Sequence, residues 1–288
     1  MKALYDVPAP AKLNLFLHIT GRRPDGYHLL QSAFMLIDWC DTLHFELRRD
    51  GIISREDLGP ALPPDDLTLR AAQALQAFAS APLGVHIAVH KQVPVQAGMG
   101  GGSSDAASCL LALNRLWNIG LPLSKLEHIG LQLGADVPFF LRGHNAWVQG
   151  IGEEIIPLTG ESQLPAARFA VLKPQAGVET RRIFEAGDLK RDTRTAIISG
   201  FAANPFGFGH NDLQPVAQRL CPEVTQALEW LAAQGLRGRM TGSGSAVFAQ
   251  LLHETDLTPP AQVPAGWILR ACSNLAVHPL VGWATSDD

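Results

Sequence analysis

The chain has 288 residues and a formal net charge of −4, with 47% apolar and 17% charged residues. This balance is typical of a water-soluble globular protein of one large or two ordinary domains. The negative net charge and the lack of any run of five or six like charges argue against nucleic acid as the main partner. The four cysteines form no CxxC pair and no apolar run approaches the length of a membrane span, so we expect reduced thiols, no membrane anchor and a cytoplasmic location.

The first regular element is expected at 12–19, where apolar and polar residues alternate as in a strand. One face of this strand would meet the core through Leu13, Leu15, Leu17 and Ile19. Lys12 and Asn14 lie on the opposite face, two residues apart, so both side chains can reach one cleft. Arg-Pro-Asp-Gly at 23–26 predicts a turn, and further strands are expected within 34–47.

The remaining elements mix helices and strands. Apolar residues at helical spacing predict helices over 65–79, 105–117 and 124–133, the last with Gly134 as its C-cap, and alternation predicts a strand over 85–89. Glycines and a proline at 150–157 mark an expected boundary between a domain at 1–152 and one at 153–288. Beyond it we expect strands at 169–172, 247–252 and 267–271 and helices at 193–201, 212–219 and 222–233. Without a regular βαβ repeat, the predicted fold class is α+β.

Residues 94–104 carry the strongest functional signal, because they place four glycines and two serines directly before a predicted helix. Glycine has no side chain to keep an anion from the backbone, and a helix N-terminus offers unpaired N–H groups and the positive end of the helix dipole. This segment, here named the glycine loop, therefore predicts a phosphate site. The alternative is a flexible turn in which Ser103 or Ser104 only caps the helix.

The glycine loop differs from the two commonest nucleotide-binding loops. A P-loop requires Lys and then Ser or Thr after its last glycine, where this chain has Ser103, and the dinucleotide fingerprint requires G-x-G-x-x-G. Gly242-Ser243-Gly244 begins like that fingerprint but lacks its third glycine. A dinucleotide-binding oxidoreductase is therefore a weak alternative.

Four segments at 10–15, 94–104, 133–140 and 240–245 together resemble the superfamily of galactokinase, homoserine kinase, mevalonate kinase and phosphomevalonate kinase. Gly-Arg-Arg-Pro-Asp-Gly-Tyr-His at 21–28 narrows the resemblance to members that phosphorylate a cytidine-diphosphate-linked methylerythritol in the non-mevalonate isoprenoid pathway. The resemblance implies a two-domain α+β fold in which ATP, Mg²⁺ and the small-molecule acceptor meet in the cleft between the domains.

The resemblance also assigns roles to residues. Asp136 corresponds to the catalytic base and Lys12 to the lysine beside it, although alone they would more often be a turn residue and a solvated strand residue. ATP is expected on Pro94, Val95, Gln96, Ala97, Gly98, Met99, Gly100, Gly101, Gly102, Ser103 and Ser104, with Mg²⁺ at Ser104. The cytosine is expected on Tyr27, His28 and Phe184, with Thr180 and Asn14 nearby.

Three positions depart from the family pattern. Met99 replaces the usual leucine, an apolar exchange of small effect. Asp66 stands near the expected adenine pocket where asparagine is common, so it receives no ATP contact. Asp105 stands where some members have asparagine, and it either helps to hold Mg²⁺ or favours the helix N-terminus.

Two alternative functions remain open in addition to a dinucleotide-binding oxidoreductase. One is a related kinase that acts on homoserine, mevalonate or a sugar, and the other is a ligand sensor that kept the fold and lost catalysis. The oligomeric state is expected to be a monomer or a weak homodimer.

Overall fold

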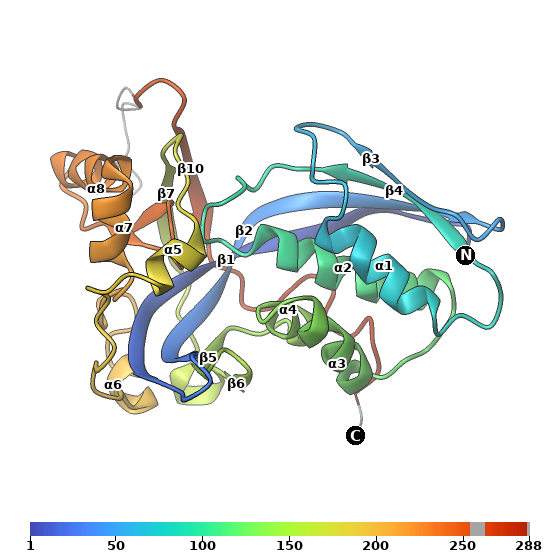
Figure 1. Ribbon diagram of the computed structural model, residues 1–288, viewed down its shortest axis with the longest axis horizontal. Coiled ribbons are helices and arrows are strands. Elements are labelled where there is room, and N and C mark those ends of the chain that lie inside the picture. The colour runs from blue at the N-terminus through green and yellow to red at the C-terminus, as the bar shows by residue number, and fades with distance from the viewer. Residues whose placement is uncertain (254–262, 287–288) are drawn as a thin grey trace.

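A long hairpin of two strands connects the two parts of the molecule. β1 (Ala3–Arg22) and β2 (His28–Arg48) pair antiparallel along almost their whole length, and the turn predicted at 23–26 joins them. The computed structural model describes residues 1–253 and 263–286. In it the hairpin extends from the sheet near the N-terminus to the helices and strands of the second half (Figure 1).

β1 is longer than the predicted strand and is buried on both faces. The apolar residues of the predicted core face are buried, as expected. Phe16, on the face expected to be polar, is also fully buried, because its ring packs within 5.1 Å of Trp147 and Phe208 and 5.8 Å of Phe201. Polar residues such as Lys12 and Asn14 are therefore enclosed by protein on all sides except toward a cleft.

Within residues 1–253 and 263–286, six strands form the first sheet. Its order is β3 (Ile53–Asp57), β4 (Gly84–His90), β2, β5 (Ala146–Gly150) and β6 (Glu154–Pro157), with β1 on β2, and β3 and β4 pair in parallel while the other pairs are antiparallel. Of the helices that the structure describes, α1 (Leu67–Gln76), α2 (Gly101–Leu116), α3 (Leu123–Leu133) and α4 (Val137–Arg142) pack on one face (Figure 1). Apolar side chains of these helices and of the sheet form one continuous core.

The second sheet has the antiparallel order β10 (Ile268–Ser273), β7 (Arg168–Lys173), β9 (Val247–Leu251) and β8 (Arg239–Met240). α7 (Gln214–Leu220) and α8 (Pro222–Ala233) contribute to its core. α8 buries Val224, Ala227 and Leu231, which recur at helical spacing, and its bounds are those predicted. Short elements complete the fold: η1 (Gly160–Ser162), α5 (Thr180–Phe184) and α6 (Ile198–Ala202).

The α+β class is confirmed, but the helix predicted over 193–201 is wrong in its first half. The N–H of Thr193 donates to the carbonyl of Ile19 on β1, and the N–H of Ala196 donates to the Gln31 side chain on β2. These backbone donors are occupied by the hairpin, so the segment stays extended and only Ile198–Ala202 is helical.

The division into 1–152 and 153–288 stays a prediction. β6 pairs with β5 beyond residue 152 and so belongs to the first sheet, and Leu280 near the C-terminus packs in the core of that sheet. All four cysteines are free, as expected. Among the helices in the described part of the chain, none has the length and apolar character needed to cross a membrane.

Candidate active site

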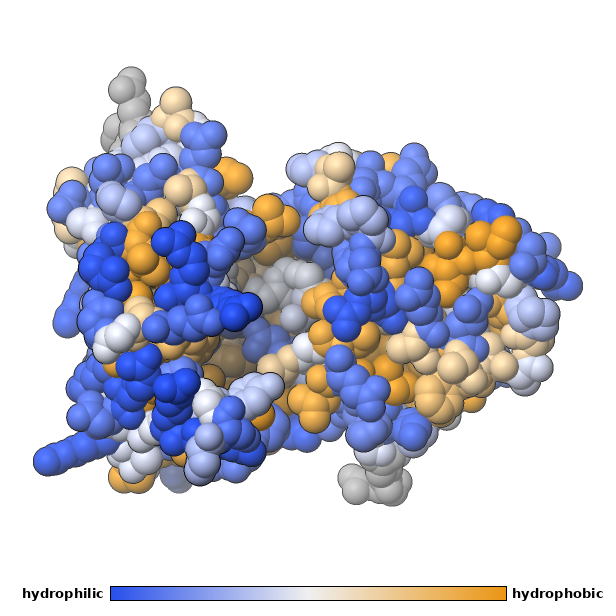
Figure 2. Space-filling view, viewed as in Figure 1, coloured by the Kyte–Doolittle hydropathy of each residue, from blue (hydrophilic) through white to orange (hydrophobic). Residues whose placement is uncertain are grey.

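A cleft of about 1010 Å³ separates the α1–α2 side of the molecule from α5. Figure 2 shows the surface hollowed between the two halves of the molecule. The cleft is lined by nearly the whole glycine loop, by Lys12 and Asp136, and by Thr180 and Phe184 on α5. The predicted catalytic pair, nearly all of the predicted ATP loop, and three of the five predicted acceptor residues (Asn14, Thr180 and Phe184) therefore line one cavity.

The glycine loop runs into α2 earlier than predicted. α2 begins at Gly101 rather than at residue 105, and its N-cap is Gly100, in the left-handed conformation with φ 70°. The first intrahelical bond goes from the Ser104 N–H to the Gly100 carbonyl. The N–H groups of Gly101, Gly102 and Ser103 precede that bond, as the first donors of a helix do. The interpretation of Ser103 or Ser104 as an N-cap is wrong, and these glycines supply the helix end that can bind phosphate.

A second glycine turn, formed by Gly242, Ser243 and Gly244, packs against the glycine loop. Gly98 has φ 72°, and a Cβ there would lie 2.3 Å from the Thr241 carbonyl oxygen. A Cβ on Gly242 would lie 2.6 Å from the Gly98 carbonyl oxygen. Backbone thus packs directly on backbone, which only glycine permits. The Gly242-Ser243-Gly244 sequence is explained by this contact, with no dinucleotide required.

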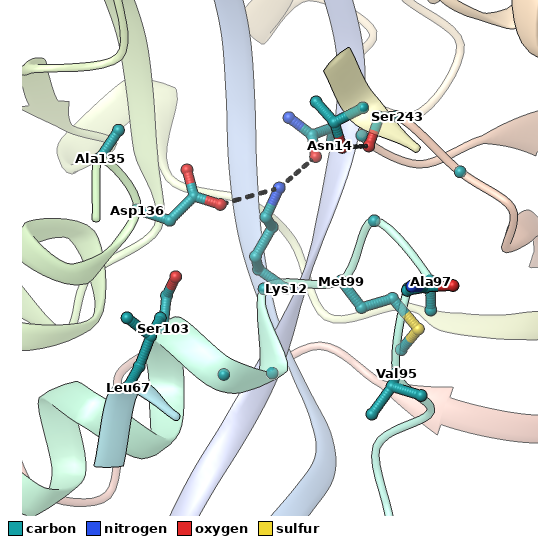
Figure 3. A pocket seen from close by; sticks show the side chains of 18 of the residues that line it. Lys12, Asn14, Leu67, Val95, Ala97, Met99, Ser103, Ala135, Asp136 and Ser243 are labelled. Atoms are coloured by element: carbon teal, nitrogen blue, oxygen red, sulfur yellow. Dashed lines mark hydrogen bonds and ion pairs between the residues drawn. The ribbon is translucent and has the colours of Figure 1, made fainter. Parts of the chain in front are cut away.

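Lys12 lies at the floor of the cleft between two partners (Figure 3). Its Nζ donates to Asn14 Oδ1 at 2.5 Å and lies 3.6 Å from Asp136 Oδ2, from the turn before α4. The Phe34 ring lies 4.5 Å from the ammonium. The Lys12 side chain is only 5% exposed, whereas Asp136 is 33% exposed and open to the cleft. The predicted proximity of Lys12 and Asp136 is therefore present in the structure.

The charge of Lys12 depends on these neighbours. Burial lowers its pKa, and the Asp136 carboxylate opposes this effect. Asn14 in turn is fixed, because its amide nitrogen donates to Ser32 and its backbone N–H donates to Thr241. Asn14 was predicted near the substrate, and it lines the cleft while orienting the lysine.

A buried ion cluster beneath the glycine loop was not predicted. Lys91 pairs with Asp105 Oδ2 at 2.7 Å and with Asp41 from β2. A Cβ on Gly101 would lie 3.3 Å from the Lys91 ammonium, so the cluster is directly under the loop. Burial raises the pKa of Asp105 to about 8 against the attraction of Lys91. No periodic pattern marks Lys91. Its position between β4 and the glycine loop is the only sequence signal that it lies near the site.

The predicted acceptor residues are only partly brought together. The His28 and Phe184 rings lie 5.1 Å apart, although they come from β2 and α5. The Thr180 hydroxyl contacts the Ser243 hydroxyl at 2.6 Å and ties α5 to the glycine turn. Tyr27 is 61% exposed, and neither it nor His28 lines the cleft. Tyr27 makes no ring contact with Phe184 within the described residues.

Three further predictions can be placed. The Ser104 side chain is fully buried and its hydroxyl donates to the Pro10 carbonyl at 2.7 Å, so it points away from the cleft that Ser103 lines. Met99 is buried with the neighbouring apolar residues, in the role expected for leucine. Asp66 caps α1 by accepting from the Leu69 N–H and contacts Arg55.

A glycine loop at a helix N-terminus, facing a lysine–carboxylate pair across one cleft, is the arrangement of a small-molecule kinase. The family signature "GHMP kinases N terminal domain" matches residues 66–144, and "GHMP kinases C terminal" matches residues 197–257. Both signatures agree with the superfamily resemblance of the sequence.

Relatives that match over nearly their whole length identify the kinase family within this superfamily. The "4-diphosphocytidyl-2-C-methyl-D-erythritol kinase" of Albidiferax ferrireducens is 69% identical over 100% of this chain and 98% of its own length. The protein of the same name from Variovorax paradoxus is 67% identical over 99% and 100%. A crystal structure of "4-(cytidine 5'-diphospho)-2C-methyl-D-erythritol kinase" is 32% identical, with a TM-score of 0.78 over 94% of this chain and 98% of that one. The chain belongs to this kinase family.

Proposed function

We propose that this protein transfers the γ-phosphoryl group of ATP to the 2-hydroxyl of 4-diphosphocytidyl-2-C-methyl-D-erythritol, in the non-mevalonate route to isoprenoid precursors. The observation that carries the proposal is the Lys12–Asp136 pair, 3.6 Å apart, in the same cleft as the N-terminus of α2. Family membership supports the identity of the acceptor. Phosphoryl transfer needs positioning and charge stabilisation more than covalent chemistry, and the cleft offers both.

ATP binds through its phosphates to the glycine loop. The N–H groups of Gly101, Gly102 and Ser103 and the positive end of the α2 dipole attract the anion. Gly98 and Gly100 hold left-handed turns that shape the loop, and the Lys12 N–H bonds to the Met99 carbonyl at 2.9 Å. The strand that carries the catalytic lysine thus also anchors the nucleotide loop.

Asp136 acts as general base. It takes the proton of the acceptor hydroxyl while that oxygen bonds to the γ-phosphorus, and the bond from phosphorus to the bridging oxygen breaks to release ADP. Lys12 supplies positive charge beside Asp136 and the incoming oxygen. Because Asn14 and Phe34 also contact its ammonium, the lysine is held in place before substrates bind.

Mg²⁺ is part of the proposal, held mainly by the ATP phosphates. Magnesium in such sites takes one or two protein oxygens and several waters or phosphates, so a dedicated cage is not required. Within the described residues no group of three acidic, histidine or cysteine side chains forms such a cage. Ser103 lines the cleft and Asp105 has a buried oxygen without a partner, so these residues would hold the ion in place of Ser104. When bound, the ion offsets phosphate charge.

The proposal also assigns the contacts of the acceptor's cytosine, the cellular compartment and the oligomeric state. Phe184 and Tyr27 stack on the cytosine, with His28 at its edge and Thr180 nearby. The enzyme acts in the cytoplasm as a monomer or a weak homodimer. Four free cysteines agree with a reducing compartment.

An acceptor panel tests the function. ADP release is measured with ATP, Mg²⁺ and, in turn, 4-diphosphocytidyl-2-C-methyl-D-erythritol, homoserine, mevalonate and galactose. We expect the highest kcat/KM with the cytidine compound and only slow ADP release without an acceptor. Equal turnover with mevalonate or homoserine would refute the acceptor assignment and favour a related kinase. Absence of ADP release with every acceptor would favour a ligand sensor.

A further inference from the structure

A second cavity lies in the other half of the molecule, beside β8 and β9. It has a volume of about 670 Å³ and, among the described residues, shares none of its lining with the cleft that holds Lys12 and Asp136. The segment 204–211, the start of α7, the turn at 234–238 and β7, β8 and β9 surround it. Sites for small molecules have volumes of roughly 300–1,000 Å³. This cavity is therefore large enough to hold a ligand of its own.

The lining of this cavity is basic. It includes the guanidinium groups of Arg237 and Arg239, and none of the lining residues that the structure describes carries a carboxylate. Asp212 lies behind the lining residue His210, and its two oxygens accept from the His210 Nε2 and from the Ile19 N–H, each at 2.7 Å. The whole chain has a net charge of −4, so the two arginines form a local concentration of positive charge. Such a lining attracts an anion.

Arg239 is largely enclosed but has no carboxylate partner. Its Nη1 donates to the Leu15 carbonyl and, at 2.6 Å, to the Phe208 carbonyl. It forms no ion pair within the described part of the chain, whereas the enclosed lysine of the active-site cleft faces a carboxylate. Burial first, and then the charge of Arg237, lower the pKa of Arg239 to about 10. An enclosed cation without a counterion is unfavourable, and a bound anion would remove that cost.

The remaining donors of Arg239 are open to the cavity. Its Nε and Nη2 make no hydrogen bond within residues 1–253 and 263–286, and neither is among the buried polar atoms that lack a partner. Arg239 lines the cavity, so a ligand there can reach these two nitrogens. Arg237, two residues earlier, is exposed and forms no ion pair with any described residue. Two guanidinium groups without partners suit phosphate, because each can donate to two phosphate oxygens at once.

Amide and aromatic side chains complete the lining. Gln234 and Gln250 line the cavity, and their side chains make no hydrogen bond within the described residues, so both can donate to further ligand oxygens. The Phe169 ring lies 5.3 Å from that of Phe206 and 6.1 Å from that of Phe248, in edge-to-face contacts. All three rings contribute to the lining. The cavity therefore offers donors for a charged group and an apolar surface for the rest of a ligand.

We propose that this cavity binds a small organic phosphate, with the phosphate group on Arg237 and Arg239 and the apolar group against the three phenylalanine rings. A phosphomonoester carries a charge of about −1.5 to −2 near pH 7, which matches two guanidinium groups. A nucleic acid or an anionic membrane would require a larger basic surface than two arginines provide. The site is additional to the proposed reaction and does not depend on it.

Phenyl phosphate is the probe of this site. It is titrated by calorimetry into the wild-type protein, alone and with Mg²⁺ and a non-hydrolysable ATP analogue in excess, so that phosphate sites in the cleft are occupied. We expect binding that persists with the analogue and is tighter than that of inorganic phosphate, because the phenyl ring gains apolar contact. Absence of binding, or its loss when the analogue is present, would overturn the proposal. Equal affinity for inorganic phosphate would overturn the role of the phenylalanine rings.

Arg237→Met removes one proposed phosphate contact without disturbing the fold, because Arg237 is exposed and makes no hydrogen bond or ion pair within the described residues. The dissociation constant of phenyl phosphate should increase about 10- to 150-fold, the range for one hydrogen bond to a charged group. Arg237→Lys should lose less affinity, since it keeps the charge but not the guanidinium fork. An unchanged dissociation constant in Arg237→Met would overturn the proposal.

Arg194→Met is the matched control. Arg194 is also exposed, forms no ion pair with a described residue and lines neither cavity. Its replacement lowers the net charge by the same amount and should leave the affinity for phenyl phosphate unchanged. An equal loss of affinity in Arg194→Met would attribute the effect to the overall charge and refute a site at Arg237.

Discussion

Replacing Gly102 by alanine separates binding of phosphate from stability of the fold. Gly102 has no left-handed backbone angle, and a Cβ there would meet only the Leu67 Cδ1, at 3.8 Å, an ordinary contact. Residue 102 is helical, where alanine is favoured over glycine by up to about 1 kcal/mol. We therefore expect Gly102→Ala to fold with a melting temperature equal to or above that of wild type.

The same methyl group should weaken ATP binding. It would lie beside one of the free N–H groups that are proposed to face the phosphates, and so prevent a phosphate oxygen from approaching the backbone closely. A hydrogen bond to a charged group contributes about 1.5–3 kcal/mol, so the ATP dissociation constant should rise about 10- to 150-fold. Acceptor affinity should change little. Titration calorimetry with ATP or a non-hydrolysable analogue gives the ATP dissociation constant, and a separate titration with the acceptor gives the acceptor dissociation constant.

Two other glycines serve as controls. Gly187 has open space around its Cβ position and no left-handed angle, so Gly187→Ala should change neither stability nor ATP binding. Gly98→Ala would place a Cβ 2.3 Å from the Thr241 carbonyl oxygen at φ 72°, so it should lower the melting temperature. An unchanged ATP affinity in folded Gly102→Ala would refute the view that the backbone there contacts phosphate.

Three further predictions concern catalysis, pH and the base site. Asp136→Asn should lower kcat about 10²–10⁴-fold and leave ATP affinity unchanged, as measured by steady-state kinetics and calorimetry. Without bound Mg²⁺ and ATP, burial raises the pKa of Asp105 from 3.8 to about 8, so the folded state holds a proton that the unfolded state has lost, and the stability of the ligand-free protein should decrease as pH rises from about 4 to 8. Asp105→Asn should flatten this dependence in thermal melts. Phe184→Ala should raise the acceptor KM about 5- to 150-fold with little change in kcat, and Tyr27→Ala should act in the same direction.

Each of these predictions has an opposing result. A kcat within twofold of wild type would remove Asp136 from the mechanism, and the exposed Asp188→Asn variant controls for loss of a carboxylate. A wild-type melting temperature that increases between pH 4 and 8, with an unchanged slope in Asp105→Asn, would contradict the assigned protonation. An unaltered acceptor KM in both aromatic variants would mean that the base binds elsewhere.

Several features of this protein follow from local sequence. Alternation over 12–19 fixed the strand that carries Lys12 and Asn14, because side chains two residues apart lie on one face. The glycines before α2 predicted the proposed phosphate site, because glycine permits left-handed turns and close approach at a helix end. The acceptor and the role of Asp136 came only from the family resemblance, since a single aspartate before a proline has no local signature of catalysis.

The tertiary structure decided the rest. The ion pair of Lys12 and Asp136 and the cluster of Lys91 with Asp105 join segments far apart in the chain, and no periodic pattern reports such pairs. The extended segment at 193–197 depends on donors and acceptors of the β1–β2 hairpin, which override helical spacing. The contact of Arg191 with His28 forms only when α5 and the following segment fold over β2. Periodicity describes which face of an element is apolar, whereas distant polar partners are chosen by how the elements pack.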